Sequence, residues 1–338
     1  MIYKNLELHN VEEIYEAKGG IALCRVPQKL GDFLDNGGRR GITRTGGIEI
    51  RFVPESSVYI TLSTLEPNTR ANLTVYYGSS QVGTLHFGDA IIDNTPRKIR
   101  FAASPETEFL DLVHKGFNKP FSKNVVRILC DGKPIVIHSV EGNARQPKKD
   151  ELPDKTIMFY GSSITHGVSA VLGNLNWPFV LAERLKVDEI NLGFPDGCRF
   201  QHEMADYIAT RQDYDAIFLE IGINFFGEDN AIIKERVLYM LNALRKNNPD
   251  KYIFCTDMFY AFTNKEQNKV KLGEVRKLVR DIVLGMNDPK IVYFDAMEAL
   301  GEDKADLISE DHIHPSIMGN LRIAEYFERK LSPYIAKI

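Results

Sequence analysis

Apolar and polar residues alternate in short runs from about Gly20 to Val140, and residues typical of turns separate the runs. In one run Val58, Ile60 and Leu62 share a face, and the residues between them are polar or amphipathic. A period of two with one apolar face predicts half-buried β-strands. About eight to ten such strands must cover each other's apolar faces, so we expect an all-β sandwich of the jelly-roll type, without helices.

Turn residues in this half predict where the strands reverse direction. Residues 72–87 contain a Gly-Ser-Ser turn between two alternating runs, and residues 125–138 contain Asp-Gly at 131–132 between two more. Both patterns are typical of β-hairpins. The Asn-Gly-Gly sequence at 36–38 predicts another turn.

A change of composition marks a boundary near the middle of the chain. Residues 142–154 contain two prolines and six charged residues and hardly any apolar side chain, which predicts a linker. We therefore divide the chain into a β domain over residues 1–145, a linker over 146–154 and a second domain over 155–338.

Beyond the linker, short apolar runs alternate with longer segments of helical period. This alternation predicts an α/β domain in which a parallel five-stranded sheet lies between two layers of helices. Asn176 is a suitable helix cap, and Trp177, Leu181 and Leu185 form a buried stripe after it. The expected strands are 156–160, 189–192, 216–221, 252–256 and 291–294, and the expected helices are 177–185, 232–244, 270–284 and one after Pro315.

The stretch from Ile157 to Gly167 joins the first of these strands to a turn that carries hydroxyl groups. Apolar residues precede Gly161, and Ser162 and Ser163 follow it. Ligands usually bind at the carboxyl ends of strands in α/β sheets, and a serine mounted there is suited to act as a nucleophile. Taken alone, this pattern favours an ordinary surface turn, so the catalytic interpretation depends on partner residues.

A segment near the carboxyl terminus contains two suitable partners. Asp311 and His314 are separated by two residues, so a turn can bring the carboxylate to imidazole Nδ1 and leave Nε2 free for the serine. Pro315 restricts His314 to an extended backbone. Two alternatives stay open, an acidic helix entry with an incidental histidine and a metal site that uses His312, although no further cluster of metal ligands accompanies it.

Two loops at other strand ends contain possible donors to an oxyanion. Asn224 follows an apolar run in the sequence Gly-Ile-Asn, and its side-chain amide can donate a hydrogen bond. The loop after residues 189–192 contains Gly193 and Gly197, whose backbone N–H groups can do the same. Each loop alone is also explained as an ordinary turn.

Taken together, the four segments resemble the sequence blocks of the SGNH/GDSL hydrolase superfamily, in the same order, over residues 156–331. The resemblance implies that Ser163 is the nucleophile and donates its own N–H to the oxyanion. It also implies that His314 is the base, that Asp311 orients it, and that Asn224 is a second oxyanion donor. An amino-terminal jelly roll is similar to the carbohydrate-esterase-like members of the superfamily.

Three positions depart from the pattern of the family. Ser162 replaces the aspartate of Gly-Asp-Ser, which leaves the nucleophile in place. Asp196 stands where the second block has its glycine, and Gly197 follows one residue later. The oxyanion donor of this block is therefore the backbone N–H of either residue, and an aspartate side chain beside the oxyanion would slow the reaction. Phe225 stands where relatives often have aspartate, so the packing of that loop should differ.

The composition of the chain limits which binding partners and which cellular compartment we expect. The chain has 338 residues and a formal net charge of −4, which gives no basic surface for nucleic acid. The first 20 residues carry scattered charges without an apolar core, which predicts a cytoplasmic protein with neither a signal peptide nor a membrane span. The cysteines are far apart and predict buried free thiols instead of disulfides or a zinc site: Cys24, Cys130, Cys198 and Cys255.

The expected activity is that of a serine esterase that needs no cofactor and no metal. It would remove acetyl or another short acyl group from a carbohydrate or similar small-molecule or oligosaccharide ester through an acyl-enzyme. The alternatives are a lipase or thioesterase and a non-catalytic carbohydrate-binding protein. The oligomeric state stays open, a homo-oligomer included. We expect the β domain to contribute to the substrate cleft through Phe117, Asn118 and Phe121.

Overall fold

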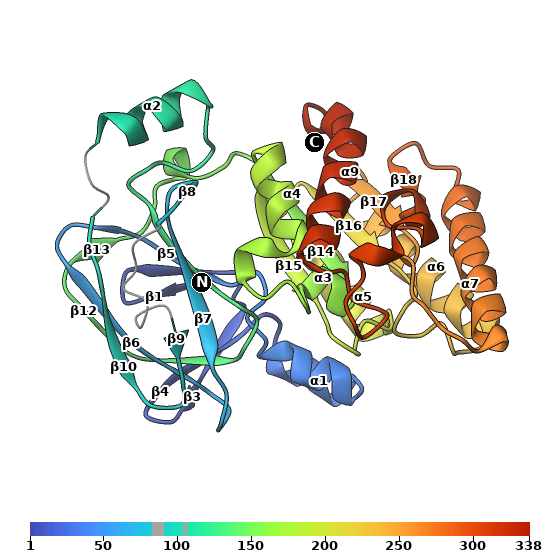
Figure 1. Cartoon of the computed structure of the whole chain (residues 1–338), viewed down its shortest axis with the longest axis horizontal. Helices are drawn as coiled ribbons and strands as arrows, with labels where there is room; N and C mark the ends of the chain where they lie inside the picture. Colours follow the sequence, from blue (N-terminus) through green and yellow to red (C-terminus); the bar gives the residue numbers. More distant parts are fainter. Residues whose placement is uncertain (83–90, 104–106) are drawn as a thin grey trace.

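The alternating pattern of the first half forms antiparallel sheets that pack face to face (Figure 1). The computed structural model of the chain describes residues 1–82, 91–103 and 107–338. Within these residues the first sheet has the order β1 (Ile2–Tyr3), β2 (Leu6–His9), β5 (Glu49–Pro54), β11 (Val126–Cys130), β7 (Ala71–Tyr77) and β8 (Ser80–Gln81), with β13 (Ala144–Arg145) beside β5 and β9 (Ile91–Ile92) beside β7. The second sheet has the order β10 (Arg97–Phe101), β6 (Val58–Thr64), β12 (Ile135–Glu141), β4 (Gly20–Cys24) and β3 (Glu13–Ala17).

The inner faces of the two sheets form one apolar core. Leu8 and Ile50 of the first sheet and Ile60 and Ile137 of the second belong to the same cluster, and each is 0% exposed. In β6 one face is covered, so Val58, Ile60 and Leu62 are buried and the residues Tyr59 and Thr61 between them are less so. Strands β5 and β11 are buried along their whole length, because their other face contacts the second domain. The expected β sandwich is confirmed.

Of the two expected hairpins, one is present in part and the other is wrong. Strand β7 turns back into β8, where Tyr77 pairs with Ser80; the remainder of that expected hairpin, at residues 83–87, lies outside the described residues. Strands β11 and β12 belong to different sheets. Asp131-Gly132 therefore carries the chain from one sheet to the other, with Gly132 at a φ of +92°. Turns and crossings favour the same residues, so the local sequence does not separate them.

The β domain also contains helices, contrary to the expectation of an all-β unit. Helix α1 (Asn36–Ile42) occupies the expected Asn-Gly-Gly turn. The Asp35 carboxylate caps it by accepting from the Gly38 N–H at 2.7 Å. Glycine is a poor helix former, but here a Cβ on Gly37 would lie 2.6 Å from the backbone of Asp196 in the second domain. Packing against that domain, and not intrinsic preference, specifies α1.

Two further helical segments of the β domain were not expected. One is the single-turn η1 (Gln28–Asp32), which precedes α1. The other is α2 (Glu108–Gly116), where the Thr107 hydroxyl accepts from the Leu110 N–H at 3.2 Å. None of the residues of α2 is buried, and the helix projects from the sandwich (Figure 1). Its apolar residues Phe109 and Leu112 are 69% and 66% exposed. Such a short apolar run does not by itself distinguish a helix from a strand.

The second domain, which is described throughout, is a parallel sheet covered by helices on both faces (Figure 1). Its strand order is β15 (Asp188–Gly193), β14 (Thr156–Gly161), β16 (Ala216–Glu220), β17 (Tyr252–Thr256) and β18 (Ile291–Phe294). The helices are α3 (Ser163–His166), α4 (Trp177–Leu185), α5 (His202–Thr210), α6 (Asn230–Asn247), α7 (Glu266–Gly285), α8 (Ala296–Ala299) and α9 (Ile317–Ile335), with the short 3₁₀ segments η3 (Gly173–Leu175) and η4 (Glu302–Leu307). The 3₁₀ turn η2 (Lys149–Glu151) lies in the linker before this domain.

Alternate residues of β14 show how the two faces of this sheet are covered. Met158 packs in a core shared with α5, α6 and α7, and Phe159 packs in another shared with α4 and α9. A strand covered on both faces is apolar throughout, which is why these strands were predictable. Asn176 caps α4 by accepting from the Phe179 N–H at 2.8 Å, as expected. Helix α5 is an addition to the expected elements.

The β domain covers the outer edge of the parallel sheet. Strand β15 is the edge strand, and Arg25 donates to the carbonyls of Asn191 at 3.0 Å and Gly193 at 2.8 Å. Arg51 forms two hydrogen bonds with the Asp188 carboxylate, at 2.6 and 2.7 Å, and both side chains are buried. An uncovered edge strand presents unpaired backbone groups to solvent. The two domains therefore share a buried polar interface.

The expected linker lies against this assembly instead of hanging free. Strand β13, at its start, pairs with β5, and Arg145 forms an ion pair with Glu151 at 2.6 Å. Because the interface of β15 depends on residues from the β domain, a fragment that starts near Leu152 would expose Asp188 and the edge of the sheet to solvent. The division at residues 145 and 155 stays a prediction.

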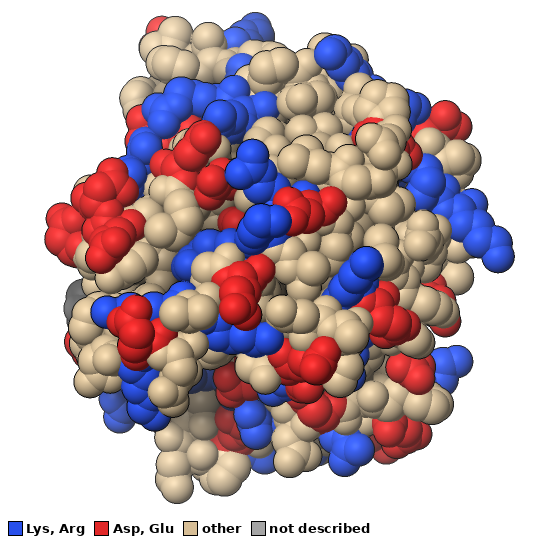
Figure 2. All heavy atoms as spheres, turned by 90° about the vertical axis from the view of Figure 1, so that its right-hand side faces the viewer, with Lys and Arg blue, Asp and Glu red and all other residues tan. Residues whose placement is uncertain are grey.

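In the described part of the chain, no helix is both long enough and apolar enough to cross a membrane. All four cysteines are free and buried, as expected. Figure 2 shows acidic and basic side chains intermixed over the end of the molecule that the second domain forms.

Candidate active site

The serine turn follows directly from the end of a buried strand. Strand β14 ends at Gly161, Ser162 caps the four-residue helix α3, and Ser163 is its first residue, 6% exposed. The N–H of a first helical residue has no acceptor within the helix. Helix α3 ends at Gly167, whose φ of +95° is accessible to glycine at no steric cost. The turn thus holds the Ser163 hydroxyl and N–H at the carboxyl edge of the sheet.

A buried carboxylate that sequence reasoning missed supports this turn. Glu220 ends strand β16 and accepts from the Ser162 N–H at 2.8 Å, from the Ser162 hydroxyl at 2.8 and 2.9 Å, and from the Thr165 hydroxyl at 2.8 Å. Burial raises the pKa of Glu220, and the hydrogen bonds from Ser162 and Thr165 oppose that shift. An acidic residue at the end of the apolar run Ala-Ile-Phe-Leu was the available signal. Burial of an acid demands such donors.

The two expected partners from the carboxyl-terminal segment meet the serine. His314 Nε2 lies 2.7 Å from Ser163 Oγ, and His314 Nδ1 lies 2.6 Å from Asp311 Oδ2. The other carboxylate oxygen of Asp311 accepts from the N–H groups of Ile313 and His314, each at 2.9 Å. Burial alone would raise the pKa of Asp311, but these hydrogen bonds hold it well below its usual range. The carboxylate therefore stays ionised and faces the imidazole N–H.

The loop that carries these two residues is closed on itself and supported from outside. Ile308 and Pro315 form a β-bridge, and the Ser309 N–H donates to the His314 carbonyl at 2.8 Å. The Phe262 N–H donates to the His312 carbonyl at 2.9 Å. The ring of His312 lies against that of Phe262, with centroids 5.4 Å apart. The alternative metal site lacks ligands, because the described residues contain no group of three His, Cys, Asp or Glu side chains able to hold an ion.

The loops after β15 and β16 lie beside this serine turn and contact each other. The Asn224 side-chain oxygen accepts from the Cys198 N–H at 3.1 Å, which directs the amide NH₂ away from that contact. The Gly197 N–H donates to the Phe194 carbonyl at 3.0 Å. The Asp196 N–H has no acceptor among the described residues. The sequence left open whether Asp196 or Gly197 donates to the oxyanion, and of the two backbone N–H groups only that of Asp196 is free in the part of the chain that the structure describes.

The side chain of Asp196 does not enter the site. Its backbone adopts a φ of +58°, a conformation in which glycine is the usual residue. The carboxylate is 76% exposed and lies 3.4 Å from Arg40. Gly197 lies against the backbone of Gly38 in α1, where a Cβ would overlap it. Phe225, the third departure, is buried and packs against Phe200 with ring centroids 5.7 Å apart.

The three expected cleft residues of the β domain lie elsewhere. Phe121 is buried beneath the Arg127 guanidinium, 3.6 Å from its ring centroid, and Phe117 is 65% exposed at the end of α2. Asn118 lines a surface hollow near the linker. The prediction of their role was wrong about position, because a short sequence motif does not report which loops face the second domain. The β-domain residues that do line a cavity beside α3 are Arg44, Asp131, Gly132 and Lys133.

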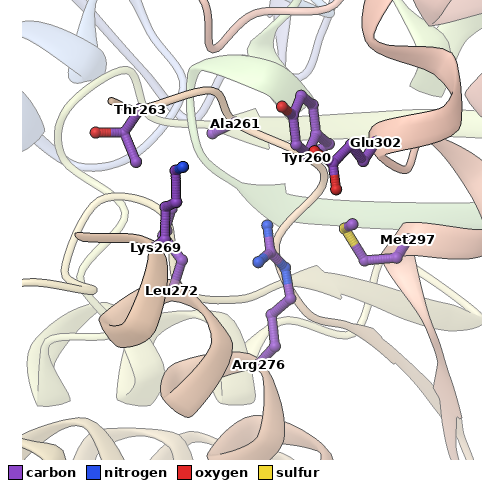
Figure 3. A pocket seen from close by; sticks show the side chains of 8 residues that line it. All are labelled: Tyr260, Ala261, Thr263, Lys269, Leu272, Arg276, Met297 and Glu302. Carbon is purple, nitrogen blue, oxygen red and sulfur yellow. The ribbon is translucent and has the colours of Figure 1, made fainter. Parts of the chain in front are cut away.

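A second cavity, of about 200 Å³, lies behind the loop that contacts the histidine segment (Figure 3). Lys269 and Arg276 of α7 point towards Tyr260 and Thr263 in the loop after β17. Arg276 donates to the carbonyls of Met258 and Phe259, at 2.9 and 3.0 Å. Its guanidinium thus stabilises the loop on which the histidine segment rests.

Comparison with protein families identifies the family of the second domain. The model of the GDSL-like lipase/acylhydrolase family matches residues 154–332, which is more than half of the 338 residues. A search of curated proteins found no match.

Solved structures share the complete arrangement of sandwich and α/β domain. A salicylyl-acyltransferase, SsfX3, from a tetracycline biosynthetic pathway aligns with a TM-score of 0.79 at 17% identity, covering 98% of this chain and 95% of that one. A putative GDSL-like lipase from Bacteroides ovatus aligns with a TM-score of 0.65 at 18% identity, covering 93% and 92%. A family two carbohydrate esterase from Clostridium thermocellum, in complex with cellohexaose, aligns with a TM-score of 0.64 at 12% identity, covering 98% and 100%. These likenesses establish the fold.

Proposed function

The chain belongs to the GDSL-like lipase/acylhydrolase family, and from this we propose that it is a serine esterase that hydrolyses short-chain acyl esters, acetyl esters included, of carbohydrates or similar small molecules. An ester-hydrolysing enzyme of this family needs a nucleophile, a base and oxyanion donors. The observation that carries the proposal is the chain of contacts from Asp311 through His314 to Ser163, at 2.6 and 2.7 Å.

The proposed reaction starts with proton transfer. His314 Nε2 takes the proton of the Ser163 hydroxyl as Oγ attacks the ester carbonyl, and Asp311 stabilises the imidazolium that forms. His314 then gives the proton to the departing alcohol, which leaves an acyl group on Ser163. Water, deprotonated by the same imidazole, attacks the acyl-enzyme and releases the acid. The contacts of Asp311 favour this sequence because they leave Nε2 directed at the serine.

Three N–H groups can stabilise the negative charge on the carbonyl oxygen. We assign this role to the Ser163 N–H, the Asp196 N–H and the Asn224 amide, and not to Gly197, whose N–H is engaged by Phe194. Each preorganised donor of this kind is worth roughly 10²–10³-fold in rate. The exposed Asp196 carboxylate, turned towards Arg40, does not oppose the charge from close range.

The class of substrate rests on similarity of fold. The cellohexaose complex of the Clostridium thermocellum carbohydrate esterase supports a carbohydrate ester. An acyltransferase is a second candidate, supported by the higher TM-score of the salicylyl-acyltransferase; its reaction would use the same acyl-enzyme with an alcohol in place of water. Product analysis in the presence of a sugar alcohol separates the two, since only transfer yields a new ester.

A fluorophosphonate tests the proposed nucleophile directly. Ser163 Oγ should attack phosphorus and expel fluoride, and mass spectrometry should find the adduct on the peptide that contains Ser163. A panel of esters with varied acyl length and alcohol should then show the fastest turnover for short acyl groups. If the folded protein is neither labelled by the fluorophosphonate nor active on any ester of the panel, the proposal is wrong and a non-catalytic binding protein is the better interpretation.

Replacing Glu220 with glutamine is expected to lower kcat roughly tenfold to a hundredfold with little change in KM, because misplacing the nucleophile by about 1 Å can cost 10²-fold. The NH₂ group of a glutamine side chain cannot accept the hydrogen bonds that Ser162 and Thr165 donate to Glu220, so the serine turn would shift. Steady-state kinetics on phenyl acetate measure the effect, and a thermal melt checks the fold. Exposed Glu274 provides the matched control, Glu274→Gln, with no change expected. A folded Glu220→Gln enzyme with kcat within twofold of the wild type would refute the positioning role.

A further inference from the structure

A cavity of about 340 Å³ lies between the two domains, beside helix α3. Arg44, Asp131 and Lys133 line it from the β domain, and His166, Val171 and Pro195 line it from the second domain. Neither domain forms it alone. Clefts at domain interfaces are a common position for ligand sites.

The cavity adjoins the residues of the proposed reaction. His166 is the last residue of α3, three positions after Ser163, and the Val168 N–H donates to the Ser163 carbonyl at 3.0 Å. Pro195 immediately precedes Asp196, whose N–H we assign to the oxyanion. Three residues of helix span about 5 Å. Ser163 itself does not line the cavity, so only a substrate with an arm that extends from Ser163 along α3 to His166 reaches it.

Its lining carries positive charge without partners. In the described part of the chain, neither the Arg44 guanidinium nor the Lys133 ammonium forms an ion pair or side-chain hydrogen bond, and both side chains are half-buried. The acidic lining residue, Asp131, already accepts from the backbone and side-chain amides of Asn72, each at 2.9 Å. Two cations and one carboxylate leave this lining with a net positive charge, and the Asp131 carboxylate is held by Asn72 and not by either cation.

The imidazole of His166 lies close to the same positive charges. Burial and the nearby cations Arg25, Arg44 and Lys133 lower the pKa of His166 well below its ordinary value, so that the ring is neutral. Neither ring nitrogen has a partner among the described residues, and the side chain is buried. The ring packs against Gly132, where a Cβ would lie 2.5 Å from it. This close packing brings the 131–133 loop, with Lys133, to α3.

We infer that this cavity binds an anionic group, a carboxylate or a phosphate, of the ester substrate, and that Arg44 and Lys133 hold it. A guanidinium pairs with such groups through two hydrogen bonds, and an ammonium adds a point charge. The inference rests on the proposed function for the position of the ester and names the substrate class more narrowly, as acyl esters that carry a negative charge. Arg276 in the other cavity differs, because its guanidinium already donates to two carbonyls.

Three matched aryl acetates test this assignment. The probes are 3-acetoxybenzoate, 3-acetoxyphenyl phosphate and the neutral 3-acetoxybenzamide, which differ in the group that would enter the cavity. For each enzyme the measured quantity is kcat/KM for an anionic probe divided by kcat/KM for the amide. Arg44→Gln and Lys133→Gln should each lower this ratio about tenfold or more, the typical effect of a hydrogen bond to a charged group. Comparing the two anionic probes distinguishes a carboxylate site from a phosphate site.

Lys246→Gln is the matched control, because Lys246 is an exposed cation at the end of α6; its ratio should equal that of the wild type. To test an anionic group on the acyl side, monophenyl succinate is compared with phenyl butyrate in the same variants. Suppose that the wild type hydrolyses the esters while Arg44→Gln and Lys133→Gln leave two ratios of kcat/KM unchanged, that of the anionic aryl acetates to the amide and that of monophenyl succinate to phenyl butyrate. In that case the cavity is not an anion site, although the proposed function stands.

Binding to an inactive enzyme separates this outcome from failure of the proposed function. Calorimetry with Ser163→Ala should find 3-acetoxybenzoate or 3-acetoxyphenyl phosphate bound at least tenfold more tightly than 3-acetoxybenzamide, and adding Arg44→Gln should remove that difference. If no ester is hydrolysed and this preference is still found, the cavity is an anion site in a protein of another function. If the preference is absent as well, the inference is overturned.

Discussion

Ser163→Ala is expected to lower kcat for ester hydrolysis by about 10⁶, the typical cost of losing the nucleophile of a serine hydrolase. The hydroxyl lies 2.7 Å from His314 Nε2, and no other atom at the end of β14 stands in that position. The remaining N–H donors would still bind the ester, so KM should change far less. Kinetics with phenyl acetate, after active-site titration of the wild type with a fluorophosphonate, measure the effect.

The neighbouring hydroxyl provides the control for this prediction. Ser162→Ala removes a donor to Glu220 and the cap of α3, so a moderate loss is expected, far smaller than that of Ser163→Ala. Both variants should keep the thermal melt of a folded protein. If Ser163→Ala retained activity within tenfold of the wild type, another group would be the nucleophile. If the two effects were reversed, Ser162 would be that group.

The second large effect is expected for Asp311→Asn, with a loss in kcat of about 10⁴ if this triad follows the serine-protease pattern. The asparagine amide would face His314 Nδ1, so the imidazole would carry its proton on Nε2, where it cannot accept from Ser163. The hydrogen bonds from Ile313 and His314 to the first oxygen can persist, so the loop should keep its shape. Kinetics and the rate of fluorophosphonate labelling measure the loss.

Two controls bear on this result. Asp303→Asn changes an exposed carboxylate on η4 and should have no effect on kcat. Because the hydrogen bonds at Asp311 hold its pKa well below the usual range, the carboxylate remains ionised through the acid pH range, and its own protonation should not limit activity there. A near-normal rate for Asp311→Asn would mean that another group orients His314 and that serine and histidine act as a pair.

The elements of the second domain were predictable because burial on both faces leaves a direct record in the sequence. Strand β14 (Thr156–Gly161) differs from the expected 156–160 by one residue, and α4 (Trp177–Leu185) has the expected bounds. Each run is apolar throughout or repeats with the helical period. The spacing of Asp311 and His314 was equally informative, since one turn suffices to bring the carboxylate to the imidazole.

The errors occurred where a segment takes its structure from residues far away in the chain. Helix α1 is rich in glycine and reads as a turn, but Gly37 and Gly41 allow it to lie against Asp196 and Phe194. The Asp131-Gly132 turn suits a hairpin, but the pairing partners of β11 and β12 carry the chain to another sheet. Local preference is weak compared with packing in such segments.

The sequence by itself indicated the five strands and four of the helices of the second domain, the β character of the first, and the serine, histidine and aspartate that meet at the site. These follow from short-range patterns: burial on one or both faces, and reactive residues placed at strand ends. The tertiary structure alone decided that Glu220 supports the serine turn, that Asp196 and not Gly197 has a free N–H, and that Arg44 and Lys133 share a cavity. The support of the serine turn and the shared cavity depend on residues that are distant in sequence, as Ser162 and Glu220 are at a separation of 58 residues, and only the folded chain brings their charges and hydrogen-bonding groups together. The Gly197 N–H is engaged by nearby Phe194, but the sequence does not specify the geometry of that turn.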